Sequence, residues 1–326
     1  MIPTRLVVHA LVREDGTVDG GELYEVAGAL GMSDQQVRLC VKRLAAEGRF
    51  EVEGRGRRAV LRVVGPGGGL PAVPEVEYVR HAYRQDRGLE PWDGVWHVFA
   101  FAVPESARAA RDALRDALTV LGAAPLQGGL YVSPHPIGPY VRARAAELGV
   151  GAGLTCLGTR DLEIGGTDDP RALAARLWPL TEIAQRYEAL RELASRPEPG
   201  HPGPGPSGPG TSGPAASGPA ASHPLARAVE LAAAFSDAML PDPLLPPELL
   251  PRPWPGAAAR TAAASAWARL HAAAPSPGPR LFRLYAQALG AQAPGAEAPG
   301  AEVPGAEVPG AEVPGAEADE PRHTPG

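Results

Sequence analysis

Side chains suited to binding nucleic acid are concentrated in one short part of the chain. Residues 33–62 include eight basic and four acidic residues, although the whole chain has a net charge of -6. Glutamine can form two hydrogen bonds with the edge of adenine, and arginine can do the same with guanine. Arginine also pairs with phosphates and enters narrow minor grooves. The segment therefore predicts contacts with double-stranded DNA.

The predicted base-contacting residues lie on a helix that starts after Ser33. Ser33 is expected as its N-cap, and Gln36 stands where a capping box requires Glu or Gln. Val37, Val41 and Leu44 form an apolar stripe that packs inward. The opposite face is predicted to contact DNA through Gln35, Gln36, Leu39 and Arg43, with Arg38 and Lys42 at its edges. Leu39 is apolar and suits the methyl group of thymine.

A basic hairpin follows this helix. The segments "RFEVEG" and "RAVLRV" predict two strands, and Arg55, Arg57 and Arg58 stand at the tip between them, among glycines that let the tip bend. Three helices and a basic hairpin predict a winged helix-turn-helix over residues 1–64. The alternative is a winged-helix protein-interaction module with solvated surface charges, because a fold alone does not define a function.

The acidic character of the chain comes from its last residues. Residues 291–326 repeat the unit "PGAEV" or "PGAEA" and hold seven acidic residues against one arginine, so the rest of the chain is neutral. Residues 196–222 are rich in Pro, Gly and Ser. Neither stretch can bury enough apolar surface to order itself. We expect a disordered linker at 196–222 and a disordered acidic tail at 291–326.

Cysteine usage and hydropathy favour a cytoplasmic protein. The two cysteines, Cys40 and Cys156, are far apart and show no metal-ligand spacing, which fits free thiols in a reduced compartment. No apolar run approaches the roughly 18 residues that a membrane span requires. The start of the chain lacks a secretory signal and reads as a helix. We expect no membrane association.

The remaining blocks predict an α+β multidomain chain. Residues 65–91 form a connector with a short polar helix at 75–85. Residues 92–168 alternate strands and helices in a ferredoxin-like pattern, although one of its four strands is not evident. Residues 169–195 read as one helix, with Asp169 as N-cap and Pro170 in its first turn. Residues 223–290 read as a helical C-terminal domain around a proline-rich centre.

Four motifs, in this order, resemble the PaaX-like family of phenylacetic acid degradation repressors. They are "MSDQQVRLCVKRLAAEGRFEVEGRGRRAVLRV", "WDGVWHVFAFAVPES", "LGAAPLQGGLYVSPHP" and "DPLLPPELLPRPWPG". The resemblance implies a homodimeric repressor of catabolic genes that binds a DNA operator and is released by an aryl-CoA thioester. The family pattern carries over to Val37, Arg38, Val41, Arg43, Leu44, Gly56, Arg57 and Arg58. Leu39 and Cys40 depart from the small pair expected there, so the operator sequence is left open.

The resemblance also relates the central domain to a small CRISPR-associated nuclease. Those nucleases hold a metal through an aspartate at the end of the first strand, where this chain has Ala102. His97 and His135 suit core or rim positions better than a metal or acid-base site. We therefore predict no enzyme activity, no metal and no cofactor. The rival hypotheses are a metal-dependent nuclease and a protein-interaction scaffold that does not bind DNA.

The sequence does not select residues for an effector. Aromatic residues of the C-terminal block could line an apolar cavity or form core and dimer contacts, and three arginines are available for ligand phosphates. The aromatic set is Phe235, Trp254, Trp267, Phe282 and Tyr285, and the arginines are Arg252, Arg260 and Arg269.

Overall fold

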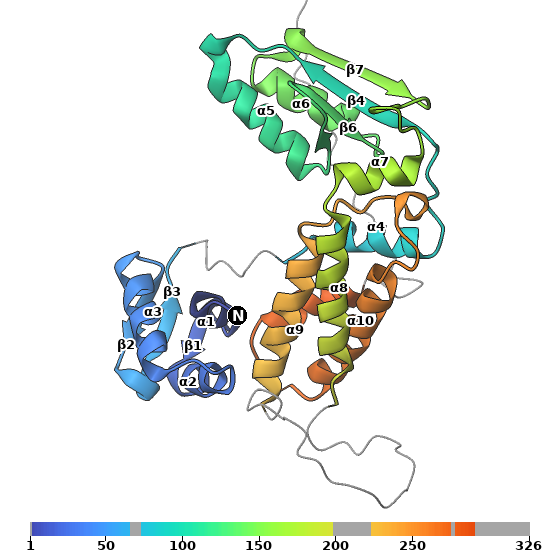
Figure 1. Ribbon diagram of the computed structural model, residues 1–326. Coiled ribbons are helices and arrows are strands. Elements are labelled where there is room, and N and C mark those ends of the chain that lie inside the picture. Colours follow the sequence, from blue (N-terminus) through green and yellow to red (C-terminus); the bar gives the residue numbers. More distant parts are fainter. Residues whose placement is uncertain (1, 66–72, 198–222, 275–277, 291–326) are drawn as a thin grey trace, which may run out of the picture. The chain divides into compact units, whose positions relative to one another are not determined.

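The computed structural model describes residues 2–65, 73–197, 223–274 and 278–290 (Figure 1). Over these residues the chain is a mixed α and β protein with several helices and two antiparallel sheets. The expected acidic tail at 291–326 and all but the first two residues of the expected linker at 196–222 lie outside the described residues.

The N-terminal region combines three helices with a small sheet. Its elements are α1 (Thr4–Ala10), β1 (Thr17–Asp19), α2 (Gly20–Ala29), α3 (Asp34–Ala46), β2 (Phe50–Glu53), the 3-10 turn η1 (Gly56–Arg58) and β3 (Val60–Val63). The sheet order is β1-β3-β2, with Val18 and Val52 both opposite Leu61. The two strands of the hairpin match the sequence prediction. Strand β1 was not predicted, because three residues are too few to show an alternating pattern.

The core of this region explains its helices. Apolar residues at helical spacing on α1 and α2, Val37 and Leu44 on α3, and Leu61 on β3 are almost fully buried together. The hydrophobic effect therefore holds the three helices on one face of the sheet. The outward face of α3 takes no part in this core, which leaves its side chains available to solvent.

The central region is a four-stranded antiparallel sheet with two helices. Its elements are β4 (Trp96–Phe101), η2 (Glu105–Ala107), α5 (Arg108–Val120), β5 (Ala124–Pro125), β6 (Leu130–Ser133), α6 (Gly138–Glu147), η3 (Gly151–Gly153) and β7 (Leu154–Thr159). The strand order is β5-β6-β4-β7. The strand that the sequence did not reveal is β5, whose two residues, one of them proline, carry no strand signal.

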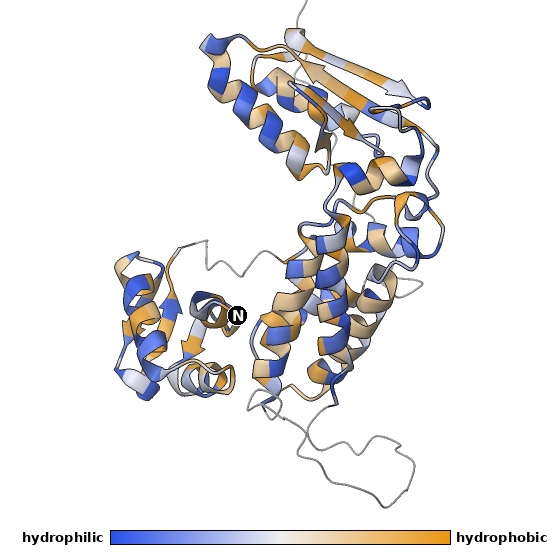
Figure 2. Cartoon of the chain, viewed as in Figure 1, coloured by the Kyte–Doolittle hydropathy of each residue, from blue (hydrophilic) through white to orange (hydrophobic). Residues whose placement is uncertain are grey.

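Strand β4 is covered on both faces. Phe99 packs with Leu114 of α5 and Val141 of α6, and these helices lie against the same side of the sheet in Figure 1. Trp96 and Val98 point to the opposite face, where Trp96 stacks on Trp178 with ring centroids 6.3 Å apart. Figure 2 shows the resulting mixture of hydrophobic and hydrophilic residues along α5.

Two helices replace the single helix expected at 169–195. These are α7 (Pro170–Leu177) and α8 (Leu180–Ser195), with the break at Trp178 and Pro179. Proline disfavours the helical region for the residue before it, and Trp178 accordingly has ψ 149°. The predicted start is confirmed, because the Asp169 side chain accepts a hydrogen bond from the Ala172 amide at 2.8 Å. Pro179 is the residue of the sequence that indicates this break between the two helices.

The C-terminal region is helical, as expected. It contains α9 (Pro224–Met239), η5 (Pro247–Leu249), α10 (Gly256–Ala272) and α11 (Leu281–Gly290), and α8 packs against α9 and α10. Among the described residues, no helix is long and apolar enough to cross a membrane. The connector contains the helix α4 (Val76–Asp86). The sequence predicted a polar helix here, but four of its residues are buried: Val79, Ala82, Tyr83 and Gln85.

Candidate nucleic-acid interface

Helix α3 presents a polar face opposite its buried stripe. Val37 and Leu44 are buried, whereas the predicted contact residues Gln35, Gln36, Arg38, Leu39, Lys42 and Arg43 are all exposed. Helical geometry places Gln35, Leu39 and Lys42 directly opposite the buried stripe, with Arg38 and Arg43 at the two sides. Lys42 thus lies near the centre of this face rather than at its edge. Leu39 is 57% exposed, so its apolar side chain is available for contact.

Gln36 has a second task within the helix. The predicted capping box is confirmed: the Gln36 amide donates to Ser33 Oγ at 3.3 Å, and Gln36 Oε1 accepts from the Ser33 amide at 2.8 Å. Reading adenine with glutamine needs both the amide oxygen and the amide nitrogen. Gln36 would therefore have to give up its cap to make that contact, whereas Gln35 carries no such commitment.

The tip of the hairpin is a defined turn rather than the loose tip expected from its glycines. Gly54 and Gly56 have φ values of 82° and 59°, which glycine adopts without strain. The turn η1 packs against the start of α2, where the Gly20 amide donates to the Ala59 carbonyl at 2.8 Å. A Cβ on Gly20 would lie 2.5 Å from that carbonyl oxygen, so only glycine allows this approach.

Arg57 is held against the helices, while its neighbours extend into solvent. Its Nη2 lies 3.7 Å from Asp34 Oδ1 at the start of α3, and its guanidinium lies 5.6 Å from the centre of the Tyr24 ring. Both charged groups are more than half exposed, so this ion pair is weak. Sequence patterns could not predict these partners, since Tyr24 is distant from Arg57 along the chain. The two contacts place the Arg57 guanidinium beside Tyr24 of α2 and the first residue of α3.

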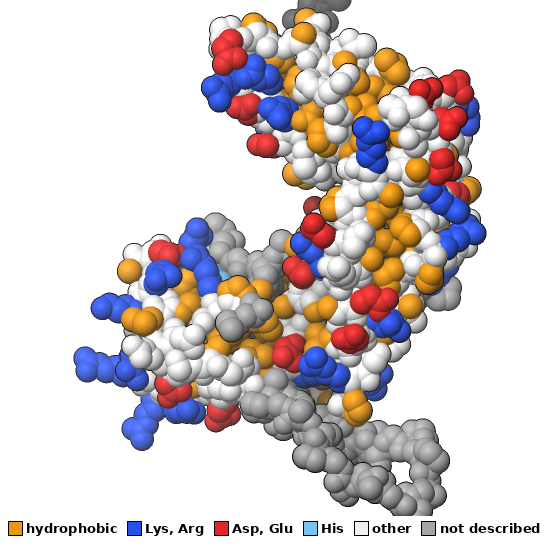
Figure 3. Space-filling model, in the orientation of Figure 1, with side chains coloured by type: hydrophobic (Ala, Val, Ile, Leu, Met, Phe, Trp, Pro, Cys, Tyr) orange, Lys and Arg blue, Asp and Glu red, His pale blue; other side chains and the backbone are white. Residues whose placement is uncertain are grey.

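Apart from Arg57, the cations of α3 and of the hairpin tip form no ion pair with any described residue. We call Arg38, Lys42, Arg43, Arg55, Arg57 and Arg58 the basic face. Among the described residues, Arg57 is the one member of the basic face that forms an ion pair. Figure 3 shows Lys and Arg side chains projecting from the N-terminal region on the side drawn. Exposed positive charge without an ion-pair partner attracts polyanions, and no internal ion pair has to break when it binds them.

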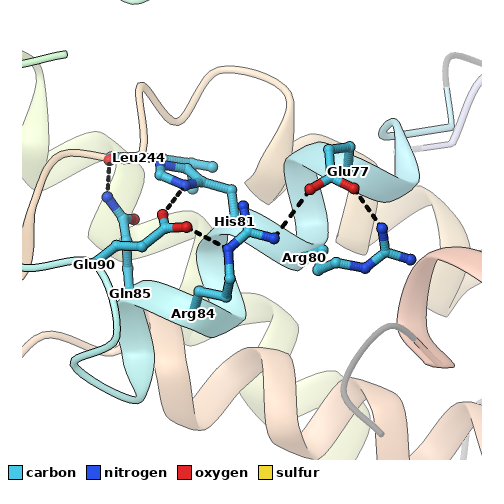
Figure 4. Close-up of polar contacts among 7 residues, drawn as sticks. All are labelled: Glu77, Arg80, His81, Arg84, Gln85, Glu90 and Leu244. Atoms are coloured by element: carbon cyan, nitrogen blue, oxygen red, sulfur yellow. Dashed lines mark hydrogen bonds and ion pairs between the residues drawn. The ribbon is translucent and has the colours of Figure 1, made fainter. Parts of the chain in front are cut away.

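A second group of polar residues lies on α4 and has the opposite character. Figure 4 shows Glu77 between Arg80 and Arg84, and Glu90 between Arg84 and His81. On the same helix the buried Gln85 donates from Nε2 to the carbonyl of Leu244 at 2.8 Å. The Gln85 hydrogen bond links α4 to the proline-rich segment after α9, whereas the ion pairs stay within residues 77–90. They satisfy one another and leave little charge for a partner.

Four residues extend this set, and we call them the Arg260 cluster: Arg260, Tyr187 and Asp242, which are buried, and Asp86, whose side chain is 17% exposed. Arg260 donates from Nε to Asp86 at 2.9 Å and from Nη1 to the Tyr187 hydroxyl at 2.8 Å, and Tyr187 donates to Asp242 Oδ2 at 2.6 Å. Burial raises the pKa of Asp242 and of Tyr187. Burial alone would lower the pKa of Arg260, but its phenolic and carboxylate neighbours raise it overall. Arg260 is 4% exposed and fully committed, so it is not available to a ligand phosphate.

The other candidates for an effector site are core residues or exposed cations. Phe235, Trp267, Phe282 and Tyr285 are buried and in ring contact, and the Tyr285 hydroxyl bonds Ser236 at 2.6 Å. Trp254 is half-buried against Tyr187, with ring centroids 6.2 Å apart. Arg252 and Arg269 are exposed. The arrangement supports the core reading of the aromatic residues rather than a ligand cavity.

The residues considered for catalysis do not assemble into a site within the described parts of the chain. Ala102 follows β4, and its amide donates to the Gly153 carbonyl at 3.0 Å. Glu105 is exposed and pairs with Arg108 and Arg111. His135 packs edge-on against His81 and bonds the Pro243 carbonyl at 3.1 Å. Over the described ranges, no three His, Cys, Asp or Glu side chains are grouped so as to hold a metal ion.

Burial shifts the pKa of one of the two histidines, His135, and of one of the two thiols, Cys40. Burial, helped by the charge of His81, lowers the pKa of His135 to about 4, so this ring is neutral at physiological pH. Cys40 is half-buried and its pKa is raised by burial, which suits an unreactive packing residue. Cys156, in contrast, is exposed on β7.

Comparison with known proteins identifies two regions. Residues 89–174 match the PaaX protein central Cas2-like domain, and residues 214–276 match the PaaX-like protein C-terminal domain. A comparison with curated protein sequences gives no match. Among solved structures, the chain is similar to the uncharacterized protein Rv0674 from Mycobacterium tuberculosis, with 21% identity over 83% of this chain and 97% of that chain and a TM-score of 0.44. The central and C-terminal regions of the chain therefore match two domains of the PaaX family, in sequence order.

Proposed function

We propose that the chain is a DNA-binding transcriptional regulator, in which residues 1–64 form a winged helix-turn-helix domain. Helix α3 would enter the major groove, and the η1 turn would act as the wing that contacts the backbone or the minor groove. The basic face carries this proposal, because its cations are exposed on the two elements that this fold directs at DNA. The PaaX domains support it, since that family suggests a transcriptional regulator.

The roles of the contact residues follow from their surroundings. Arg38, Arg43 and Gln35 would read base edges, and Leu39 would meet a thymine methyl group. Arg55 and Arg58 would pair with phosphates, while Arg57, steered by Tyr24 and Asp34, would enter the neighbouring groove. The main role of Gln36 would be to cap α3. None of these roles requires a metal or a catalytic group.

The remaining features complete the proposal. The central region would be a ferredoxin-like domain, since a strand order of β5-β6-β4-β7 is the order of that fold. It would have no nuclease activity, because Ala102 stands where the related nucleases have a metal-binding aspartate. The protein would act as a homodimeric repressor of catabolic genes, cytoplasmic and relieved by a small acyl-CoA-type effector. Effector binding would favour a dimer whose two recognition helices no longer match the spacing of the half-sites.

A DNA footprint tests this function. The full chain is titrated onto the DNA upstream of its own gene and of the neighbouring genes, with and without the candidate effector. The proposal expects a protected pair of half-sites that disappears when the effector is added. Protection nowhere in these regions would favour the scaffold hypothesis, and strand cleavage in Mg²⁺ or Mn²⁺ would favour the nuclease.

A further inference from the structure

The two edges of the central sheet are built differently. At one edge β5 has two residues, includes Pro125, and is covered nearby: Trp178 Nε1 donates to the Gly122 carbonyl at 3.0 Å, and Pro243 lies against Gly122. At the other edge β7 has six residues, with neither proline nor charge. Proteins normally blunt an exposed edge strand with charge, proline or a cover. Strand β7 shows none of these among the described residues.

The side chains of β7 are open to solvent as well. Thr155, Cys156, Leu157 and Gly158 are all exposed, and Leu157 is 51% exposed although it stands opposite the buried Val98 of β4. Figure 1 shows β7 at the margin of the sheet, and Figure 2 shows it without the blue of charged residues. An uncharged strand of this length at a sheet margin is a template for pairing with another strand.

The pairing with β4 decides which backbone groups point outward. The Ala102 amide donates to the Gly153 carbonyl, and the antiparallel register pairs Thr155 with Ala100 and Leu157 with Val98. Hydrogen-bonded pairs alternate along such a ladder, so Gly153, Thr155 and Leu157 bond β4. The backbone groups of Leu154, Cys156 and Gly158 therefore face the free edge. No described strand pairs with them there.

We propose that β7 is the pairing edge for a second copy of this chain, which adds its own β7 antiparallel across a twofold axis at Cys156. The inference rests on the proposed homodimer and names the surface that would form it. In this register Cys156 stands opposite the partner's Cys156, and Leu154 stands opposite the partner's Gly158. The two sheets become one continuous sheet, and the exposed Leu157 gains a neighbouring strand.

The charge pattern of β7 suits pairing with a second copy of the same strand. A twofold axis places each residue opposite a residue of the same segment, so charges within β7 would meet like charges. The strand itself has none, and Arg160 and Asp161 beyond its end fall opposite Ala152 and Gly151 of the partner subunit, which are uncharged. The interface is isologous, as a regulator that reads two half-sites requires.

Cys156 provides a probe for this register. Opposed residues in a hydrogen-bonded antiparallel pair have Cα atoms about 5.5 Å apart, within the ~4.4–6.8 Å span of a disulfide. Diamide oxidises two thiols to one disulfide and accepts the two hydrogens that they release. Treating the full chain with diamide should yield a dimer on a non-reducing gel. Cys40→Ser should crosslink equally well, whereas Cys156→Ser should not crosslink.

The size of the unmodified protein provides the second measurement. Sedimentation under reducing conditions should give a dimer for the wild type and for Cys156→Ser, and a monomer for Cys156→Lys, which places two like charges opposite each other. Cys156 is exposed, so the lysine should leave the folded circular dichroism spectrum of the chain unchanged. Cys156→Pro removes an outward amide and no bond to β4, and should also give a monomer.

Other results would overturn the inference. A wild-type monomer at every concentration would do so, as would a dimer that persists in Cys156→Lys or a crosslink that depends on Cys40. These results leave the DNA-binding proposal standing, because a footprint by the wild-type chain tests that separately. Conversely, a β7 dimer that protects no DNA would support the interface and remove the proposed function.

Discussion

Arg58 at the tip between β2 and β3 and Arg260 on α10 carry the same guanidinium group in opposite surroundings. Arg58 is exposed and has no ion pair with any described residue, whereas Arg260 is buried and bonded to Asp86 and Tyr187. A buried guanidinium that is desolvated and already hydrogen-bonded within the protein is not accessible to a ligand. The two residues differ because the charge of Arg58 is accessible to solvent, whereas the Arg260 cluster holds segments of the chain together.

The strongest test of this contrast is Arg260→Ala. Removing one partner from a buried ion pair leaves the others unsatisfied and typically costs about 3–5 kcal/mol. We expect a clear fall in the temperature and urea concentration of unfolding, measured by circular dichroism. Arg58→Ala is the matched control and should change stability by less than about 0.5 kcal/mol. Equal effects of the two changes would remove the distinction between the regions.

A second test uses acid. The pKa of His135 is about 4 in the folded chain and about 6.5 when unfolded, so the unfolded chain takes up the proton first as pH falls. The stability contributed by the neutral ring is complete above pH 6.5 and is lost between about 6.5 and 4, by about 3 kcal/mol in all. His9 adds a slope of the same sign, since burial also lowers its pKa.

His135→Gln isolates the first contribution. The glutamine amide can still donate to the Pro243 carbonyl but does not titrate in this range. The pH dependence of the unfolding temperature should therefore flatten between pH 6.5 and 4 without vanishing. A wild-type slope retained in full by the variant would assign the acid sensitivity elsewhere.

On the binding surface, single changes on α3 should alter specificity more than stability. Arg38→Ala and Arg43→Ala should each reduce discrimination between the protected site and a scrambled duplex by about 1–3 kcal/mol if the side chain reads a base. Competition binding measures this difference. A loss that is equal for both duplexes would reassign that arginine to the phosphates.

Substitutions at Gln36 should have a small effect on stability, and they distinguish helix capping from base reading. Gln36→Ala should destabilise α3 by about 1 kcal/mol, because it removes half of the capping box. Gln36→Glu keeps a capping acceptor but loses the amide donor. If capping is the main role, Gln36→Glu should unfold like the wild type and discriminate DNA sites as well as it does. Lost discrimination with unchanged stability would show that Gln36 reads a base instead.

The sequence predicted what depends on local patterns. The capping box at Ser33, the start of α7 at Asp169, and the hairpin strands all follow from spacing and residue type within a few positions. The three-residue β1 and the two-residue β5 are too short to leave such a pattern. The Arg260 cluster could not be predicted either, because Asp86 and Arg260 are far apart in sequence.

The exposure of the candidate contact residues was predictable from the sequence, and the contacts among them were not. Charge and helical spacing identified the exposed residues of α3 and the arginines of the turn. Only the fold reveals that Tyr24 and Asp34 orient Arg57, that Gln36 caps its own helix, and that Lys42 lies near the centre of the outward face. Each of these depends on contacts that side chains make after the helices have packed.

The salt dependence of DNA affinity tests the central claim most directly. Fluorescence anisotropy of a labelled duplex is measured across salt concentrations for the wild type and for a variant with Arg55, Arg57 and Arg58 changed to alanine. Each phosphate contact contributes about 0.9 to the slope of log affinity against log salt, so the variant should bind more weakly with a slope shallower by up to about 3. Equal affinities and equal slopes for the two proteins would contradict the account.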